Sequence, residues 1–96
     1  MTDLTGYFAN DVSAPVVFTL PTTAAQFDYI EIVGVSAQGW SIVENSGQSI
    51  VFGNVTTTAT TGGLASTNGT DSVRLQCIVA NLTWQVVYAV GNITYT

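Results

Sequence analysis

The sequence predicts an all-β protein: a compact antiparallel β-sandwich of the jelly-roll-like type, with about seven or eight short strands. Three observations support this class. Val, Ile and Thr dominate the segments between turns, apolar and polar residues alternate along these segments, and helical spacing of apolar residues is absent. Turn signals recur about every 8–12 residues, as in sandwiches. No shift in composition marks a linker, so we expect residues 1–96 to form a single domain.

The first third of the chain shows short strand patterns separated by prolines. Residues 5–8 can add an extra strand, and residues 15–20 (PVVFTL) predict a strand that starts at Pro15 and stops before Pro21. Residues 22–26 (TTAAQ) are expected to form a connection with room for one helical turn.

The middle of the chain shows three segments that resemble consecutive hairpins: residues 27–35, 40–43 and 49–52. Each alternates apolar and polar residues, so one face of each strand is expected to be covered. In the first segment, Glu31 belongs outside because a lone carboxylate is rarely buried. Turns are predicted at residues 37–39 and 45–47. The side chains expected to face inward are Ile30, Ile32, Trp40, Ile42, Ile50 and Phe52.

Asn54–Thr70 (NVTTTATTGGLASTNGT) is predicted to be a long loop rich in Thr and Gly. Leu64 is the one side chain there that can anchor it to the core, and Asn68-Gly69 is a dipeptide typical of hairpin turns. Because loops carry recognition more often than scaffold strands do, ligand-facing residues are expected in this segment.

The last third of the chain predicts two longer strands and a short one, at residues 71–79, 83–89 and 93–96. Gly53-Asn54-Val55-Thr56 is echoed by Gly91-Asn92-Ile93-Thr94, which we interpret as two similar turns at strand edges. The side chains expected to face inward are Val73, Leu75, Cys77, Val79, Trp84, Val86 and Tyr88.

Charge is very sparse in this sequence and excludes several kinds of partner. The 96 residues contain one Lys or Arg, six Asp or Glu and no His, for a formal net charge of −5. One cation, Arg74, is too few to neutralise nucleic-acid phosphates or an anionic membrane surface. No apolar run is long enough to cross a bilayer. The start of the chain lacks the pattern of a signal peptide, so we expect synthesis in the cytoplasm.

The same composition favours self-association. Hydrophobic residues make up 47% of the chain, which is enough to build a core and leaves apolar, uncharged surface beyond it. Burying part of this surface against further copies of the chain would remove it from water.

Catalytic and metal-binding patterns are weak. Without His there is no triad and no imidazole ligand, and Cys77, the single cysteine, is predicted to be a buried hydrophobic residue. Asp28 and Glu31 point to opposite faces of one strand, so they cannot act as a glycosidase pair. The sequence leaves Asp28 with Asp71, or Glu44 with Asp71, open as a pair. We therefore expect no enzyme activity, no metal and no cofactor.

Aromatic residues are the remaining candidates for ligand contact, because exposed rings can stack on sugars. Trp40 and Trp84 follow the apolar phase of their strands and are predicted to be core residues. Tyr29 follows the opposite phase and is the better candidate for a subunit or ligand contact. The other tyrosines that could belong to a glycan platform are Tyr7, Tyr88 and Tyr95.

Several spaced motifs give the chain a resemblance to a known family. The most distinctive stretch is GWSIVENSGQSIVFGNV, at residues 39–55. Around it, from the N-terminal side to the C-terminal side, are Leu20-Pro21-Thr22-Thr23-Ala24-Ala25, Ser66-Thr67, Asp71-Ser72-Val73-Arg74-Leu75-Gln76-Cys77, Ala80-Asn81, Trp84 and Gly91-Asn92-Ile93-Thr94. Together these motifs resemble a C-terminal domain of bacteriophage and prophage tail-fibre-like proteins, over about residues 5–96.

This resemblance implies a structural protein of the virion that forms a homotrimer, contacts other virion proteins and binds a host-surface glycan or protein at a fibre tip. It identifies no receptor-binding residue. An alternative is a capsid decoration, cement or head-fibre protein without a receptor. A secreted glycan-binding module or a glycan-active enzyme is a weaker alternative.

Overall fold

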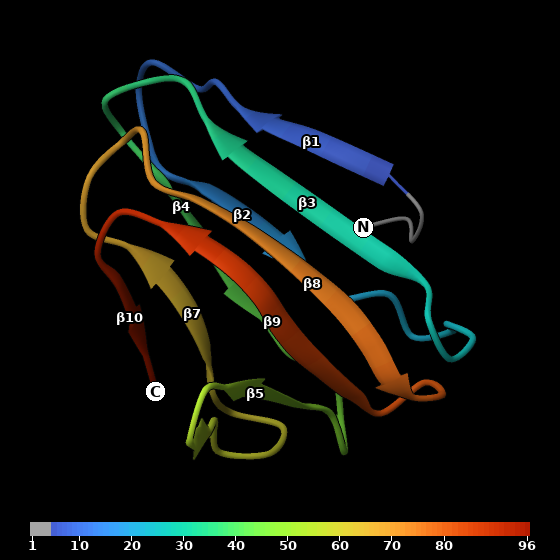
Figure 1. Ribbon diagram of the computed structural model, residues 1–96. Coiled ribbons are helices and arrows are strands. Elements are labelled where there is room, and N and C mark those ends of the chain that lie inside the picture. The colour runs from blue at the N-terminus through green and yellow to red at the C-terminus, as the bar shows by residue number, and fades with distance from the viewer. Residues whose placement is uncertain (1–4) are drawn as a thin grey trace.

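The computed structural model describes residues 5–96 and shows ten strands in two sheets, with no helix among these residues (Figure 1). The predicted all-β, sandwich-like class is confirmed, whereas the expected number of seven or eight strands is too low. In chain order the strands are β1 (Thr5–Ala9), β2 (Val16–Thr19), β3 (Tyr29–Gly34), β4 (Trp40–Val43), β5 (Ser49–Phe52), β6 (Val55–Thr56), β7 (Gly63–Ser66), β8 (Ser72–Val79), β9 (Thr83–Val90) and β10 (Ile93–Tyr95).

The two sheets are mixed, which corrects the prediction of a purely antiparallel sandwich. The six-stranded sheet has the order β1-β3-β8-β9-β5-β6, and the four-stranded sheet has the order β10-β7-β4-β2. Three pairs are parallel: β1 with β3, β2 with β4, and β5 with β9. Parallel neighbours need a crossover connection, and in the first two cases the crossover contains a strand of the opposite sheet.

The predicted meander of three hairpins is also wrong. From β1 to β5 the chain alternates between the six-stranded and the four-stranded sheet, so β3, β4 and β5 do not pair with one another. The turns at residues 37–39 and 45–47 are present, and Gly39 and Gly47 adopt positive φ angles of 75° and 80° there. These turns carry the chain from one sheet of the sandwich to the other.

Asn54–Thr70 contains the strands β6 and β7 and is not the long loop that was expected. β6 forms one edge of the six-stranded sheet, and β7 lies between β4 and β10 in the four-stranded sheet. Leu64 is buried, as predicted. Asn68 and Gly69 do form a turn, closed by the Asp71 N–H donating to the Asn68 carbonyl (3.1 Å), but the turn joins strands of different sheets and makes no hairpin.

Other local predictions are confirmed. The extra strand near residues 5–8 is β1. Residues 22–26 are a connection without a helical turn. Gly53 and Gly91 both adopt positive φ, at 64° and 99°, just before the edge strands β6 and β10, so the repeated Gly-Asn marks two similar turns.

The core lies between the two sheets and matches the alternation closely. It contains both tryptophans and the single cysteine, all buried as predicted. Phe52 and Val86 are partly buried against it. The fully or nearly buried apolar residues are Ala9, Leu20, Ala24, Ile30, Ile32, Trp40, Ile42, Ile50, Leu64, Val73, Leu75, Cys77 and Trp84.

Two residues that were predicted to face inward lie on the surface. Val79 is 47% exposed and Tyr88 is 40% exposed. Both follow irregularities in the β8–β9 pairing, between Arg74 and Leu75 and between Cys77 and Val79. A bulge inserts an extra residue and so reverses which face the following side chains occupy.

Candidate functional site

The outer face of the six-stranded sheet gathers the polar and aromatic side chains that point away from the core. Strand pairing aligns them in two neighbouring rows across β3, β8 and β9. We call this set the polar face: the row Glu31, Arg74 and Tyr88, and the adjacent row Tyr29, Gln76 and Gln85.

Arg74, the only basic residue of the sequence, is held at the centre of the polar face. Its guanidinium carbon lies 4.2 Å from the centroid of the Tyr29 ring, a cation–π contact. One guanidinium nitrogen, Nη1, lies 3.8 Å from Glu31 Oε1, and the Tyr88 hydroxyl donates to Glu31 Oε2. The ion pair is partly exposed, so it contributes little to stability. Together with the cation–π contact and the Tyr88 hydrogen bond, it links all four side chains.

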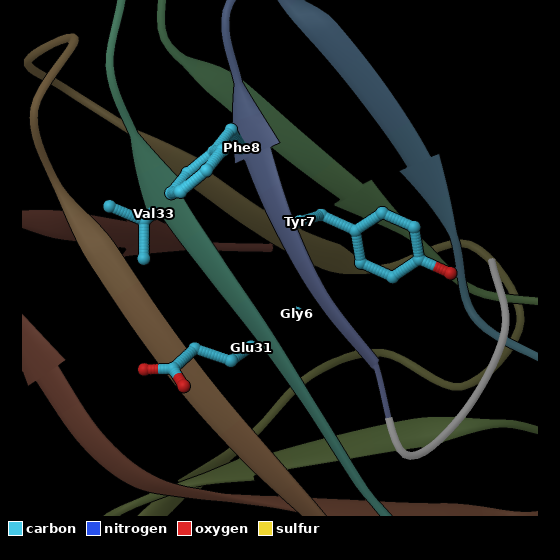
Figure 2. A pocket seen from close by; sticks show the side chains of 5 residues that line it. All are labelled: Gly6, Tyr7, Phe8, Glu31 and Val33. Atoms are coloured by element: carbon cyan, nitrogen blue, oxygen red, sulfur yellow. The ribbon is translucent and has the colours of Figure 1, made fainter.

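A shallow hollow of about 260 Å³ adjoins the polar face at β1 and β3. It is lined by Gly6, Tyr7, Phe8, Glu31 and Val33 (Figure 2). Figure 2 shows Phe8, Val33 and Glu31 on one side of the strands and Tyr7 directed away from them. The hollow exists because Gly6 has no side chain: a Cβ there would meet no atom within 4 Å. Phe8 is 75% exposed and offers a ring at the border of the hollow, next to Val33 (Figure 2).

The outer face of the four-stranded sheet has the opposite chemistry. Its outward-pointing residues are small, aliphatic or hydroxylated, and none of them can carry a charge. A second shallow hollow, of about 190 Å³, lies over β4 and β7. We call the set of outward-pointing residues the uncharged face: Val17, Thr19, Ser41, Val43, Gly63, Ala65 and Thr94.

The aromatic residues considered as ligand contacts are divided between the core and the surface. Trp40 and Trp84 are in the core, and the Trp40 ring N–H donates to the Asp71 carbonyl at 2.7 Å. Tyr29 lies on the outer surface, as its phase predicted. Tyr7 packs against the Phe18 ring with centroids 5.4 Å apart, so it is a poor candidate for a sugar platform.

The two carboxylate pairs that the sequence left open are separated in the fold. The Asp28 carbonyl accepts a hydrogen bond from the Cys77 N–H (2.7 Å), close to the end of β8, whereas Asp71 precedes the start of the same strand. Glu44 follows the end of β4, whereas the Asp71 carbonyl bonds to Trp40 at the start of β4. Neither pair faces a common cleft.

Asp71 has a structural role in the turn that follows β7. Its Oδ2 accepts hydrogen bonds from the backbone N–H groups of Thr67 (3.0 Å) and Asn68 (3.1 Å). Burial alone would raise the pKa of this carboxyl, but the hydrogen bonds from Asn68 and Thr67 outweigh burial and lower the pKa below its usual value.

Glu44 is the most deeply placed acid after Asp71, at 8% exposure. Its Oε2 accepts a hydrogen bond from the Thr57 hydroxyl, which in turn accepts from the Ile50 N–H at 2.8 Å. Its Oε1 is buried without a hydrogen-bond partner. Burial raises the pKa of Glu44, and the Thr57 hydrogen bond offsets only part of this effect.

Residues 5–96 offer neither a cluster of metal ligands nor a helix that could span a membrane. No three His, Cys, Asp or Glu side chains in that range gather closely enough to hold a metal ion. No helix in the same range is long and apolar enough to cross a bilayer.

Sequence reasoning did not find the hollow or the contacts of the polar face. Glu31, Arg74 and Tyr88 come from three strands, and only strand register brings them together. Phe8 carried a weak signal, because it is a large apolar residue on the polar phase of its strand. The expected ligand-facing segment, Asn54–Thr70, contributes β6 to a sheet edge and β7 to a sheet interior.

No protein-family model matches the sequence, and a search of curated proteins finds no significant match.

Proposed function

We propose that this protein is a structural domain of a bacteriophage virion, which forms a homotrimer at a fibre tip and contacts a receptor on the host surface. The resemblance of residues 39–55 and the surrounding motifs to tail-fibre-like domains suggests the class. The sparse charge of the chain supports self-association independently.

The observation that carries the proposal is the contrast between the two sides of the sandwich. Among the described residues, the seven that point outward from the four-stranded sheet include no ionisable side chain, whereas the polar face bears both Glu31 and Arg74. Charged residues are depleted at the centres of protein interfaces, so an uncharged surface suits contact with further copies, and the polar surface suits a hydrophilic ligand.

The polar face and its hollow suit a hydrophilic receptor. Amide groups of Gln76 and Gln85 and the hydroxyls of Tyr29 and Tyr88 can both donate and accept hydrogen bonds. The exposed Phe8 ring beside the hollow can stack on a sugar or on an apolar side chain. A host glycan is the receptor that this combination fits best.

A capsid decoration or cement protein is the second candidate, and one observation favours it. The segment expected to recognise ligands, Asn54–Thr70, is largely occupied by β6 and β7 and by the turns between them. A decoration protein needs a surface for the capsid lattice and no projecting recognition loop.

The trimer is tested by the native mass of the purified chain. We expect about 30 kDa, three times the 10.1 kDa chain mass. A mass of 10.1 kDa at micromolar concentration would overturn the proposal.

Receptor contact is tested by binding of the labelled chain to host cells and to a glycan array. Arg74→Ala and Tyr88→Ala should reduce binding at least tenfold while the native mass stays the same. Antibody labelling of the head and not the tail would support the decoration protein instead. Turnover of a polysaccharide by the purified chain would support a glycan-active enzyme.

A further inference from the structure

We propose that Asn68-Gly69 is a site of spontaneous covalent modification, at which Asn68 loses ammonia and is converted to a mixture of aspartate and isoaspartate. This dipeptide is the one Asn-Gly of the sequence, and it lies in the turn between β7 and β8. The inference does not depend on the proposed function.

The reaction joins two groups within the dipeptide. The Gly69 backbone nitrogen loses its proton and attacks Cγ of the Asn68 side chain, so that a C–N bond forms, the Cγ–Nδ2 bond breaks and ammonia leaves. Water then opens the resulting cyclic imide at either of its two carbonyl carbons. One opening gives aspartate, and the other gives isoaspartate, in which the backbone passes through Cγ and is longer by one carbon. Glycine favours the attack because it has no Cβ to hinder the approach of its nitrogen.

Both reacting groups are available in the folded protein. Asn68 is exposed, and its two hydrogen bonds in this turn use backbone groups. Its N–H donates to Asp71 Oδ2 at 3.1 Å, and its carbonyl accepts from the Asp71 N–H, also at 3.1 Å. Within residues 5–96, neither the Asn68 carboxamide nor the Gly69 N–H makes a hydrogen bond. The attack therefore breaks no hydrogen bond of the atoms that react.

Packing requires the glycine that makes this dipeptide reactive. A Cβ on Gly69 would lie 2.1 Å from the Ser36 carbonyl oxygen and 2.6 Å from Ala37 Cα. Both contacts are with backbone atoms, so a side chain at this position would displace the chain. The fold thus retains Gly69 for a reason unrelated to the reaction, and the reaction is best tested by changing Asn68.

The modification affects a turn that connects the two sheets. The Asp71 carbonyl accepts hydrogen bonds from the Gly34 N–H on β3 (3.1 Å) and from the Trp40 ring N–H on β4 (2.7 Å). Either product adds a negative charge to Asn68, whose N–H donates to the Asp71 carboxylate, and like charges repel. Isoaspartate also lengthens the turn. We therefore expect the modified protein to melt at a lower temperature.

Ageing of the purified chain tests the site. The protein is kept at about 37 °C and pH 8.5, and its peptides are analysed by mass spectrometry and by enzymatic methylation of isoaspartate. Conversion at Asn68 should exceed conversion at Asn54 or Asn92 by about tenfold or more. These two residues are matched controls, because both are exposed. They precede Val55 and Ile93, whose branched side chains hinder the attacking nitrogen.

Substitutions at Asn68 test the effect on the fold. Ageing should lower the melting temperature of the wild type by about 4 °C or more, a shift typical of a small loss of stability in a domain of this size. Asn68→Ser has no carboxamide to react, so its melting temperature should stay constant during ageing. Freshly prepared Asn68→Asp carries the new charge without the longer backbone, and it should melt between the fresh and the fully aged wild type.

Each part of the inference can fail separately. Equal conversion at Asn68, Asn54 and Asn92 overturns the site. Conversion of Asn68 in urea but not in the native protein also overturns it, because the folded turn would then protect the dipeptide. Conversion that leaves the melting temperature of the wild type unchanged overturns the inferred effect on the junction between the sheets.

Discussion

At the scale of single residues, Trp84 is one of the largest side chains of the core. It is fully buried and lies in register with Cys77 on β8 and with Ile50 on β5. We expect Trp84→Ala to lower the free energy of unfolding by about 3–5 kcal/mol, because the substitution leaves a large cavity. Thr58→Ala, at an exposed position, should change it by less than about 0.5 kcal/mol. Urea denaturation measures both, and equal small effects would contradict the inward placement of Trp84.

Glu44 gives a pH dependence whose sign can be worked out. Its pKa in the folded protein is raised above the ordinary value of 4.5, so the folded state holds this proton more tightly than the unfolded state does. Stability should therefore fall as pH rises from 4.5 through the folded pKa. Glu44→Gln removes this loss. The free energy of unfolding of the variant should therefore rise relative to that of the wild type as pH rises. Urea denaturation from pH 4 to pH 8 tests this prediction. A difference in the free energy of unfolding between variant and wild type that stays constant with pH would refute it.

Asp71 is the internal comparison for that experiment because its pKa is shifted in the other direction. The contribution of Asp71 is present above its unfolded pKa of about 3.8 and is lost as pH falls through the lower folded value. The two carboxyl groups thus affect stability at different ends of the pH range. Glu44→Gln should leave unchanged the loss of stability that Asp71 causes at low pH.

The alternation of residue types predicted most buried side chains correctly, but it could not place Val79 or Tyr88. Alternation assumes one residue per pairing position, and both residues follow an irregularity in the β8–β9 pairing. This irregularity matters for the candidate site, because it places Tyr88 on the outer face, where its hydroxyl donates a hydrogen bond to Glu31.

At the scale of secondary-structure elements, the end of β3 packs against the turn before β8 with no space for a side chain. A Cβ on Gly34 would lie 2.1 Å from the Gly69 carbonyl oxygen, which is backbone and cannot move aside. We expect Gly34→Ala to lower the free energy of unfolding by about 1–3 kcal/mol. Gly6→Ala on the adjacent strand β1 meets no atom and should change it by less than about 0.5 kcal/mol. Thermal unfolding of both variants measures the contrast, and similar melting temperatures would contradict this packing.

Most strands could be located from the sequence, but their partners could not. Strand positions depend on local features such as Pro15, the turn at Gly39 and the alternation that follows each turn. Pairing depends on contacts between distant residues, for example β5 with β9. The polar face joins β3, β8 and β9, so its composition could be expected in part from Tyr29 and Glu31, whereas its geometry could not.

At the scale of the whole molecule, the few charges are distributed unevenly among the described residues. Asp71 and Glu44 are buried and serve the fold, Asp28 caps a turn, and Glu31 pairs with Arg74 on the polar face. The uncharged face receives none of them. Among the described residues, the two outer sheet faces therefore differ: the polar face carries the Glu31–Arg74 ion pair, and the seven residues of the uncharged face carry no ionisable side chain.

This distribution predicts how the assembly responds to salt. At 1 M NaCl the Debye length is about 3 Å, so contacts that depend on ion pairs weaken strongly. The chain has one basic residue, Arg74, so few ion pairs can join its copies, and screening also reduces repulsion between chains that each carry a net charge of −5. We therefore expect the native mass to stay at about 30 kDa, three chains of 10.1 kDa, from about 0.05 M to 1 M NaCl. A wild-type mass that falls to 10.1 kDa at high salt would show that charged residues hold the copies together and would contradict this prediction.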